Sequence, residues 1–450
     1  MTAIDDALTT ATDTRAVLLS RGAIAGTGRL FTDVFGDATA LVVADESTWR
    51  VAGQAVVDSL VSAGVTCLEP YVFPGKPTLY ADYGNVSMLR DHAAATDAVI
   101  VVVGSGTLND IAKLASGELD RPYAVVATAA SMDGYAAFGA SITRDGFKIT
   151  RTCPAPALIV ASLDVMATAP ARLTATGYGA LVEKLPAGAD WVVADELGIE
   201  PIDTDVWNLV QPPLRHALAD PAGCAAGDVG AISALAEGLL LSGLAMQALQ
   251  SSRPASGAGH NFSHQWEMEK HGFDWEPPLT HGIKVGLGTI ASCALYEAAL
   301  LLDVSGVDPE ACAAAWLTPE QDVARVTALQ PQPAIREPAI AQSRLKYVPA
   351  GEAADRIRAI KAAWPAIIER VRPLLLGPAD VAERLHKVGS AYHPAQIGIS
   401  QDRLRRTYFQ AQTIRSRYTM FDALYELGLL DTVVDALFAP GGYWSDWPHD

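Results

Sequence analysis

The first third of the chain alternates short apolar runs with helix-like stretches, and this alternation limits the possible fold more than any other feature. The runs lie in "ALVVADES" (40–47), "DAVIVVVGSG" (97–106) and "PYAVVATAAS" (122–131). Short, uniformly apolar runs separated by helices indicate a parallel sheet covered on both faces. The segment therefore predicts a doubly wound, Rossmann-like α/β domain.

The pattern changes after about residue 161, where long Ala- and Leu-rich helical periods take over. Examples are "GDVGAISALAEGLLLSGLAMQAL" (227–249) and "EAADRIRAIKAAWPAIIERVRPLLL" (352–376). Apolar residues repeating every three to four positions predict helices. We expect an α/β domain over 1–163, followed by an all-α domain over 164–450.

The composition narrows the partners of such a protein. Its 450 residues are 50% hydrophobic and carry a formal net charge of -18. This charge argues against nucleic acid and anionic membranes as main partners, although a local basic pocket can still bind a small anion. The five scattered cysteines and a start without a basic, then apolar, segment favour a cytoplasmic protein.

A glycine-containing turn follows one of the predicted strands, in "VVVGSGTLNDIAK" (101–113). Gly104 and Gly106 let the backbone approach a ligand, and the helix start behind them offers N–H groups and a positive dipole end to a pyrophosphate. A turn without a ligand is the alternative. Asp45 ends an earlier strand, where it could bind a ribose or cap a helix.

Four of the nine histidines lie within "GHNFSHQWEMEKHGFDWEPPLTHG" (259–282). Neutral imidazole is a good ligand for Zn, Ni or Fe, and a carboxylate normally completes such a site. His264 follows His260 by four residues, one helical turn along the same face. His271 is best interpreted as a loop histidine.

Several segments together resemble the sn-glycerol-1-phosphate dehydrogenase family, within the dehydroquinate-synthase-like and iron-containing alcohol dehydrogenase superfamily. They are "VADESTWRVAG" (43–53), "GSGTLNDIAK" (104–113), "ATAASMDGYAAFGAS" (127–141), "SRPASGAGHNFSH" (252–264) and "THGIKVGLGT" (280–289). The resemblance implies an NAD(P)-binding domain, an all-α metal and substrate domain, and an active site in the cleft between them.

The same resemblance assigns roles to individual residues. It implies Asp45 near the adenosine ribose, with Lys113 and Lys148 as phosphate contacts. Asp133, His264 and Lys148 are the expected catalytic residues. The remaining expected cofactor contacts are Gly104, Ser105, Gly106, Asn109 and Asp110 around the pyrophosphate, and Thr128 and Ser131 near the nicotinamide.

The metal site implied by the resemblance is incomplete in this chain. The family pattern has one Asp and two His, and the matching histidines are His260 and His281. Ala180 stands at the Asp position in "TATGYGALVEKLPAGADW" (174–191), and Gly259 stands where relatives usually carry an acidic residue. Glu183, one helical turn after Ala180, is a possible substitute ligand.

Three interpretations of function follow. The first is an NAD(P)-dependent oxidoreductase acting on a small polyol, sugar or glycerol phosphate. The second is a metal-independent, NAD-retaining dehydratase, epimerase or lyase, with His260, His264 or His281 as acid or base. The third is a catalytically inactive nucleotide-binding homologue, or a chain in which Ala180 was introduced deliberately. A homodimer is expected, and the basic segment 403–418 is interpreted as one helix with a solvated or subunit-contacting face.

Overall fold

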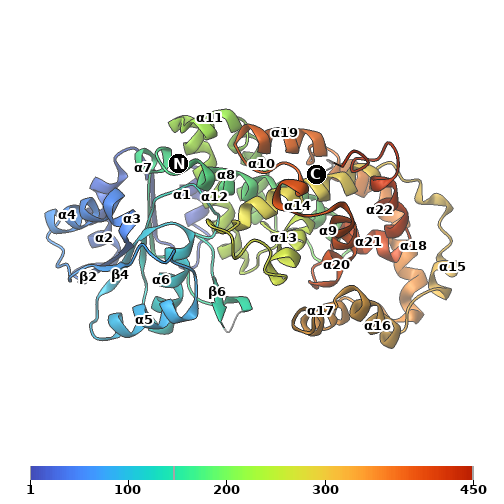
Figure 1. Ribbon diagram of the computed structural model, residues 1–450, viewed down its shortest axis with the longest axis horizontal. Helices are drawn as coiled ribbons and strands as arrows, with labels where there is room; N and C mark the ends of the chain where they lie inside the picture. The colour runs from blue at the N-terminus through green and yellow to red at the C-terminus, as the bar shows by residue number, and fades with distance from the viewer. Residues whose placement is uncertain (1, 145–146, 448–450) are drawn as a thin grey trace. The chain divides into compact units, whose positions relative to one another are not determined.

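The computed structural model describes residues 2–144 and 147–447, without the side chains of 147–149 (Figure 1). Six strands form one parallel sheet in the order β1-β8-β5-β4-β2-β3. The strands are β1 (Ala16–Ser20), β2 (Ala40–Asp45), β3 (Tyr71–Phe73), β4 (Val99–Gly104), β5 (Ala124–Ala127) and β8 (Leu158–Ser162). A separate antiparallel hairpin joins β6 (Ala140–Arg144) to β7 (Phe147–Arg151).

The central strands are buried, as their apolar sequences require. β4 and β5 are buried along their whole lengths, and β2 is buried up to Asp45. Val42 and Val101 share one core cluster with Phe31 of α2 (Thr27–Phe35) and Leu60 of α4 (Gln54–Ser62). Such strands are stable only when helices cover them, which explains the β-helix-β order of the sequence.

Two neighbouring strands of the sheet mark its topological switch point. The chain leaves β2 for β3 on one side, and it leaves β4 for β5 on the other. The register pairs Val43 with Val102, so the carboxyl ends of β2 and β4 lie side by side. Open parallel sheets bind ligands outside the carboxyl ends of their strands at such a point.

The other helices fill the remainder of the chain. Those up to residue 249 are α1 (Ala3–Leu8), α3 (Glu46–Thr48), α5 (Tyr83–Ala94), α6 (Gly106–Glu118), α7 (Leu163–Ala167), α8 (Ala171–Val182), α9 (Lys184–Glu196), α10 (Thr204–Ala217), α11 (Pro221–Ala226) and α12 (Val229–Leu249). The later ones are α13 (Ala258–Met268), α14 (His281–Ala299), α15 (Pro309–Ala314), α16 (Pro319–Leu329), α17 (Pro333–Leu345), α18 (Ala350–Val371), α19 (Pro378–Lys387), α20 (Gln401–Thr413), α21 (Met420–Glu426) and α22 (Leu430–Phe438).

The chain divides into two compact units. The sheet unit comprises Met1–Leu181, Asp205–Ser252 and Lys387–Gly389; the helical unit comprises Val182–Thr204, Arg253–His386 and Ser390–Asp450. Helices α8, up to Leu181, and α12 thus cluster with the sheet. The division at 163 and 164 drawn from the sequence stays a prediction.

Helix α12 belongs to the interior of the sheet unit. Among the described residues it is the one helix long and apolar enough to span a membrane, but 72% of its apolar window is buried within the protein. Gln247 donates to the carbonyl of Ala136 and to Thr14 Oγ1. Gly243 lets the helix approach the backbone of Asp133, where any side chain would collide with the carbonyl oxygen. These contacts identify α12 as a core helix.

In the helical unit, α13 and α14 pack against each other at glycines. A Cβ atom on Gly288 would collide with the carbonyl oxygen of Gly259. Asp190 of α9 fixes the start of α13, because its Oδ2 accepts a hydrogen bond of 2.6 Å from the backbone N–H of Ala258. The close packing places the histidines of α13 beside the first residue of α14.

Candidate functional site

The first part of the candidate site is the turn from β4 into α6. Ser105 is the N-cap of α6 and makes no side-chain capping bond, so the first-turn N–H groups depend on other acceptors. A Cβ on Gly106 would lie 3.1 Å from Met132 Sδ, and one on Gly104 would lie 2.5 Å from Leu108 Cδ1. The turn therefore needs small residues, and it presents backbone donors at the positive end of a helix dipole.

The other expected cofactor residues of α6 and β5 lie close to this turn. Asn109 is buried and its Oδ1 accepts a hydrogen bond of 3.1 Å from Tyr123. Asp110 Oδ2 accepts one of 3.4 Å from the backbone of Ser141, while the N–H of Thr128 donates to the carbonyl of Gly104. These contacts fix the frame around the turn, and the cofactor roles of the three residues stay predictions.

Asp45 caps the helix that follows β2. Its Oδ1 accepts hydrogen bonds of 2.8 Å from the N–H groups of both Ser47 and Thr48. The Thr48 hydroxyl accepts in return from the Asp45 N–H, which completes a capping box. The N-cap role that the sequence left open is thus present, and the ribose contact stays a prediction.

Lys113 organises the loop after β5, a role that the sequence did not indicate. Its ammonium group donates to the carbonyls of Gly134, Ala137 and Gly139 at 2.7, 2.6 and 3.3 Å. Three donors are all that an ammonium has, so a phosphate would have to compete with these carbonyls for Lys113. Burial lowers the pKa of Lys113.

The two other polar residues of this loop belong to the set expected from the sequence. Asp133 Oδ2 accepts a hydrogen bond of 3.2 Å from Ser242, and Ser131 is buried. Lys148 lies on β7, and its side chain is outside the described part of the structure. The catalytic assignment of Asp133 and Lys148 therefore stays a prediction.

A separate candidate site in the helical unit is a triangle of histidines. The ring centroids are 5.8 Å apart for His260 and His264, 5.5 Å for His260 and His281, and 5.6 Å for His264 and His281. His271 lies in a turn, where Nε2 is 2.6 Å from the carbonyl of Ile397 and Nδ1 is 3.1 Å from Arg403. We call His260, His264 and His281 the histidine triangle.

Two glutamates contact Nδ1 atoms of the triangle. Glu183 Oε2 lies 2.8 Å from His260 Nδ1, and Glu267 Oε1 lies 3.0 Å from His281 Nδ1. Glu267 hydrogen-bonds His281, and a carboxylate in that place holds the proton on Nδ1 and leaves Nε2 as the functional atom. The Glu183–His260 pair is a close contact without hydrogen-bond geometry. Glu183 is 0% exposed, and burial raises its pKa to about 7.

Arg415 contacts the third histidine. Its Nη2 lies 2.9 Å from His264 Nε2, and because a guanidinium can only donate, Nε2 accepts this hydrogen bond. The proton of a neutral ring is then on Nδ1, 3.8 Å from Glu267 Oε2. Burial, and then the charge of Arg415, keep the pKa of His264 well below its ordinary value. His264 is therefore a neutral histidine whose Nε2 is occupied.

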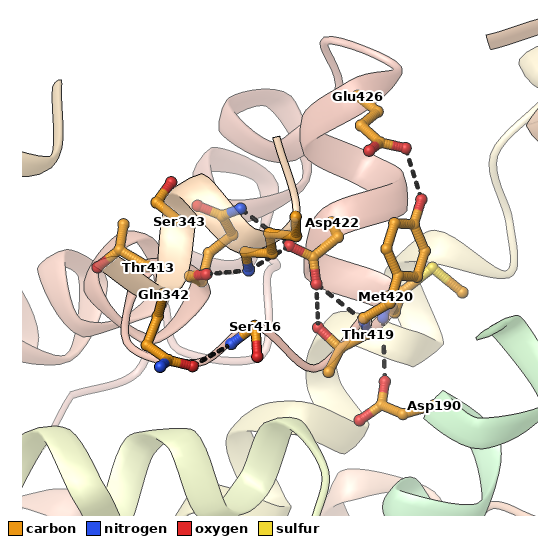
Figure 2. Close-up of polar contacts among 12 residues, drawn as sticks. Asp190, Gln342, Ser343, Thr413, Ser416, Thr419, Met420, Asp422 and Glu426 are labelled. Atoms are coloured by element: carbon orange, nitrogen blue, oxygen red, sulfur yellow. Dashed lines mark hydrogen bonds and ion pairs between the residues drawn. The ribbon is translucent and has the colours of Figure 1, made fainter. Parts of the chain in front are cut away.

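The segment that carries Arg415 corrects the interpretation of 403–418 as one helix. Helix α20 ends at Thr413, because the chain turns inward at Ile414. Figure 2 shows how the following turn is fixed: Ser416 N–H donates to Gln342, Thr419 donates to Asp422, and Met420 N–H donates to Asp190. Arg405 remains exposed beside Asp435. Arg415 and Arg417 instead enter the helical unit.

The residues present do not fit the divalent metal that the family resemblance implies. Among the described residues, no three His, Cys, Asp or Glu side chains are arranged to hold a metal ion. Ala180, 5% exposed near the end of α8, has no donor atom. A third ligand for His260 and His281 is missing, because Glu183 is used on Nδ1 and on backbone N–H groups.

Comparisons with solved structures identify the fold. A sulfoacetaldehyde reductase from Bifidobacterium kashiwanohense in complex with NAD+ aligns over 94% of this chain and 98% of its own, with a TM-score of 0.58 and 13% identity. A glycerol dehydrogenase from Schizosaccharomyces pombe covers 98% and 95%, with a TM-score of 0.57 and 17% identity. The family model described as iron-containing alcohol dehydrogenase matches residues 18–170. The fold is that of this dehydrogenase class, which confirms the predicted α/β plus all-α architecture.

Sequence relatives identify the family within that class. The glycerol-1-phosphate dehydrogenase [NAD(P)+] of Geobacillus thermodenitrificans is 30% identical over 395 residues, 87% of each chain. That of Halalkalibacterium halodurans is 37% identical over 258 residues, a stretch that spans 57% of this chain and 64% of the relative. This chain belongs to the glycerol-1-phosphate dehydrogenase family, as the sequence motifs predicted.

Proposed function

We propose that the protein is an NAD(P)-dependent oxidoreductase of a small phosphorylated polyol, with glycerol 1-phosphate as the first candidate substrate. The observation that carries the proposal is the turn at Gly104–Gly106, which lies at the switch point of a parallel sheet. The names of the relatives, glycerol-1-phosphate dehydrogenase [NAD(P)+], support both the cofactor and the substrate class.

The residues of the sheet unit fit the dinucleotide. The N–H groups at the start of α6 would hold its pyrophosphate, and Asp45 at the end of β2 would bind its ribose. A bound NAD(P)+ supplies the hydride acceptor. Oxidation of the carbinol transfers a hydride from carbon to the nicotinamide ring, and the hydroxyl proton goes to a base, so that ketone, NAD(P)H and one proton result.

The helical unit offers two bases for this proton. His260 and His281 each have a glutamate at Nδ1, which directs the lone pair of a neutral ring to Nε2. Histidine with a carboxylate at its other nitrogen is a common general base. His264, predicted from the sequence as catalytic, would act less directly because Arg415 contacts its Nε2.

The test is a spectrophotometric assay of NAD(P)H formation with both enantiomers of glycerol phosphate, with glycerol, and with dihydroxyacetone phosphate in the reverse direction. Cofactor-dependent turnover of one phosphorylated polyol supports the proposal. An absence of NAD(P) binding in calorimetry contradicts it at the cofactor, and binding without turnover contradicts it at the reaction.

A second candidate is an NAD-retaining, metal-independent dehydratase, epimerase or lyase. The missing third metal ligand favours this alternative, because a metal-independent enzyme does not need it. Such enzymes return the hydride to the product and therefore produce no net NADH. Nicotinamide that co-purifies with the protein and is not consumed during turnover would favour this candidate over the first.

The architecture also supports coarser proposals about the state of the protein. A small-molecule substrate is consistent with the relatives. We propose a cytoplasmic homodimer with functional domains over 1–163 and 164–450. Light scattering of the purified protein measures the oligomeric state, and limited proteolysis locates the domain limits.

A further inference from the structure

Glu183 occupies the space beside Gly259. A Cβ atom built on Gly259 would lie 2.8 Å from Glu183 Cγ, 3.3 Å from Glu183 Oε1 and 3.2 Å from the backbone nitrogen of Thr289. The first distance is shorter than real Cβ contacts, and both groups are enclosed by α13 and α14. An acidic side chain at position 259 therefore cannot be accommodated beside Glu183 without a shift of one of them.

Both carboxylate oxygens of Glu183 already contact groups at the start of α13. Oε1 accepts hydrogen bonds of 2.9 Å from the N–H of Gly257 and 3.3 Å from the N–H of His260. Oε2 lies 2.8 Å from His260 Nδ1. The carboxylate is thus on the Nδ1 side of the ring, whereas a ligand on Nε2 lies at the opposite edge of the imidazole.

Positive charge in the helical unit also lies close to the triangle. Arg415 contacts His264, and the Lys284 ammonium lies 3.8 Å from Glu267 Oε1 and is fully buried. Arg415 and Lys284 offset the charges of the Glu183 and Glu267 carboxylates, so little net negative charge is left to attract a divalent cation. The same cations can stabilise negative charge that develops on a substrate oxygen.

We infer that Glu183 is a positioning residue for His260, placed where an acidic residue at 259 would otherwise lie, and that the histidine triangle acts without a bound divalent metal. The inference rests on the proposed dehydrogenase function for its catalytic meaning. Glu183 places a carboxylate against the Nδ1 edge of His260 and holds the backbone N–H of the same residue, Glu267 hydrogen-bonds Nδ1 of His281, and Arg415 with Lys284 supplies the positive charge.

The first experiment measures metal directly. The full chain is purified without chelator, its metal content is determined by mass spectrometry, and Zn²⁺ and Ni²⁺ are titrated calorimetrically. We expect the unaltered protein to carry below about a tenth of an equivalent, and A180D to bind either metal at least about 10-fold more tightly. A175D, a carboxylate added at another buried position of α8, is the matched control and should not gain metal.

The second experiment tests the positioning role through rescue. E183A should lower kcat by about 10-fold or more with little change in KM, and E183A/G259E should restore it because the carboxylate returns from the other side of the same space. G259E alone should be destabilised by the clash with Glu183. A merely structural role of Glu183 would give no rescue by the double variant.

The outcomes separate this inference from the proposed function. About one equivalent of tightly held metal in the unaltered protein, or turnover only after metal is added, would overturn the inference while leaving the dehydrogenase function intact. Turnover in the presence of EDTA supports both. A metal-free protein that binds NAD(P) but oxidises no polyol phosphate would instead contradict the proposed function.

Discussion

The turn before α6 and the histidine triangle differ in the kind of atom that would contact a ligand. At the turn before α6 the important groups are backbone N–H donors, whose position depends on the strand, the turn and two glycines. In the histidine triangle they are side chains, oriented by Glu183, Glu267 and Arg415. A backbone site persists as long as the fold does, whereas one substitution can change what a side-chain site binds. The turn before α6 therefore depends on the fold, while the histidine triangle depends on individual side chains.

The largest effect on stability is expected at Asp190, a buried residue that fixes the start of α13, the helix that carries His260 and His264. Asp190 is fully buried and accepts from the Ala258 N–H, the Met420 N–H and the Tyr296 hydroxyl. Asp190→Ala leaves these donors unpaired and should lower the free energy of unfolding by about 3–5 kcal/mol. Urea denaturation measures the change, with exposed Asp274→Ala as the control. A loss no larger than that of the control would show that the hydrogen bonds of Asp190 do not stabilise the helical unit.

In the sheet unit the corresponding test is Lys113→Met. The substitution keeps the length of the side chain but leaves the carbonyls of Gly134, Ala137 and Gly139 without their donor. The expected loss is about 1–3 kcal/mol of unfolding free energy. A phosphate contact alone would predict unchanged stability of the free protein and weaker substrate binding, so chemical denaturation without ligand distinguishes the two roles.

A third substitution distinguishes cofactor binding at the turn before α6 from the stability of the fold. Gly106→Asp places a carboxylate in the first turn of α6, which suits the helix dipole but repels a pyrophosphate. We expect NAD(P) affinity to fall about 10-fold or more, an effect of about 1.4 kcal/mol. A small loss of stability should accompany it, because the new Cβ atom lies 3.1 Å from Met132 Sδ. Gln54→Asp, at the exposed first residue of α4, is the control. Equal affinities in the two variants would place the cofactor elsewhere.

The smallest effect concerns pH. Burial raises the pKa of Glu426 to about 7, well above its ordinary value of 4.5, so the folded protein binds the proton more tightly than the unfolded chain. Stability from this group is present below about pH 4.5 and is lost as the pH rises towards 7. Glu426→Gln should make the unfolding free energy less dependent on pH, by about 1 kcal/mol between about pH 6 and pH 7. Urea midpoints at several pH values, compared with the unaltered protein, would show an unchanged slope if Glu426 does not contribute.

Local sequence patterns made the sheet and the turn before α6 predictable. The buried runs at 40–47, 97–106 and 122–131 correspond to β2, β4 and β5, and the turn after β4 begins α6 at Gly106. Strand burial and helix starts depend on neighbours in sequence, so a single chain reveals them. The long Ala- and Leu-rich periods after residue 161 likewise predicted the all-α second part.

The arrangement of the triangle could not be predicted in the same way. Glu183 precedes His260 by 77 positions, and Arg415 follows His264 by 151. Nothing local marks either contact, and the charge pattern of 403–418 indicated an outward face for Arg415. A glycine where the family pattern has an acid was the one available signal, and only the packing of α13 on α14 explains it.

The exclusion between Gly259 and Glu183 also has a historical consequence. If the two acidic side chains cannot coexist, a lineage can move from one to the other only through an intermediate with neither carboxylate or through one strained by both. The first intermediate lacks a carboxylate beside His260 and the second is strained, so the effect of a change at either position depends on the residue at the other. Ala180→Asp alone adds the missing donor, but a design that also alters position 183 must alter position 259 with it, since the effect of each of these two changes depends on the other.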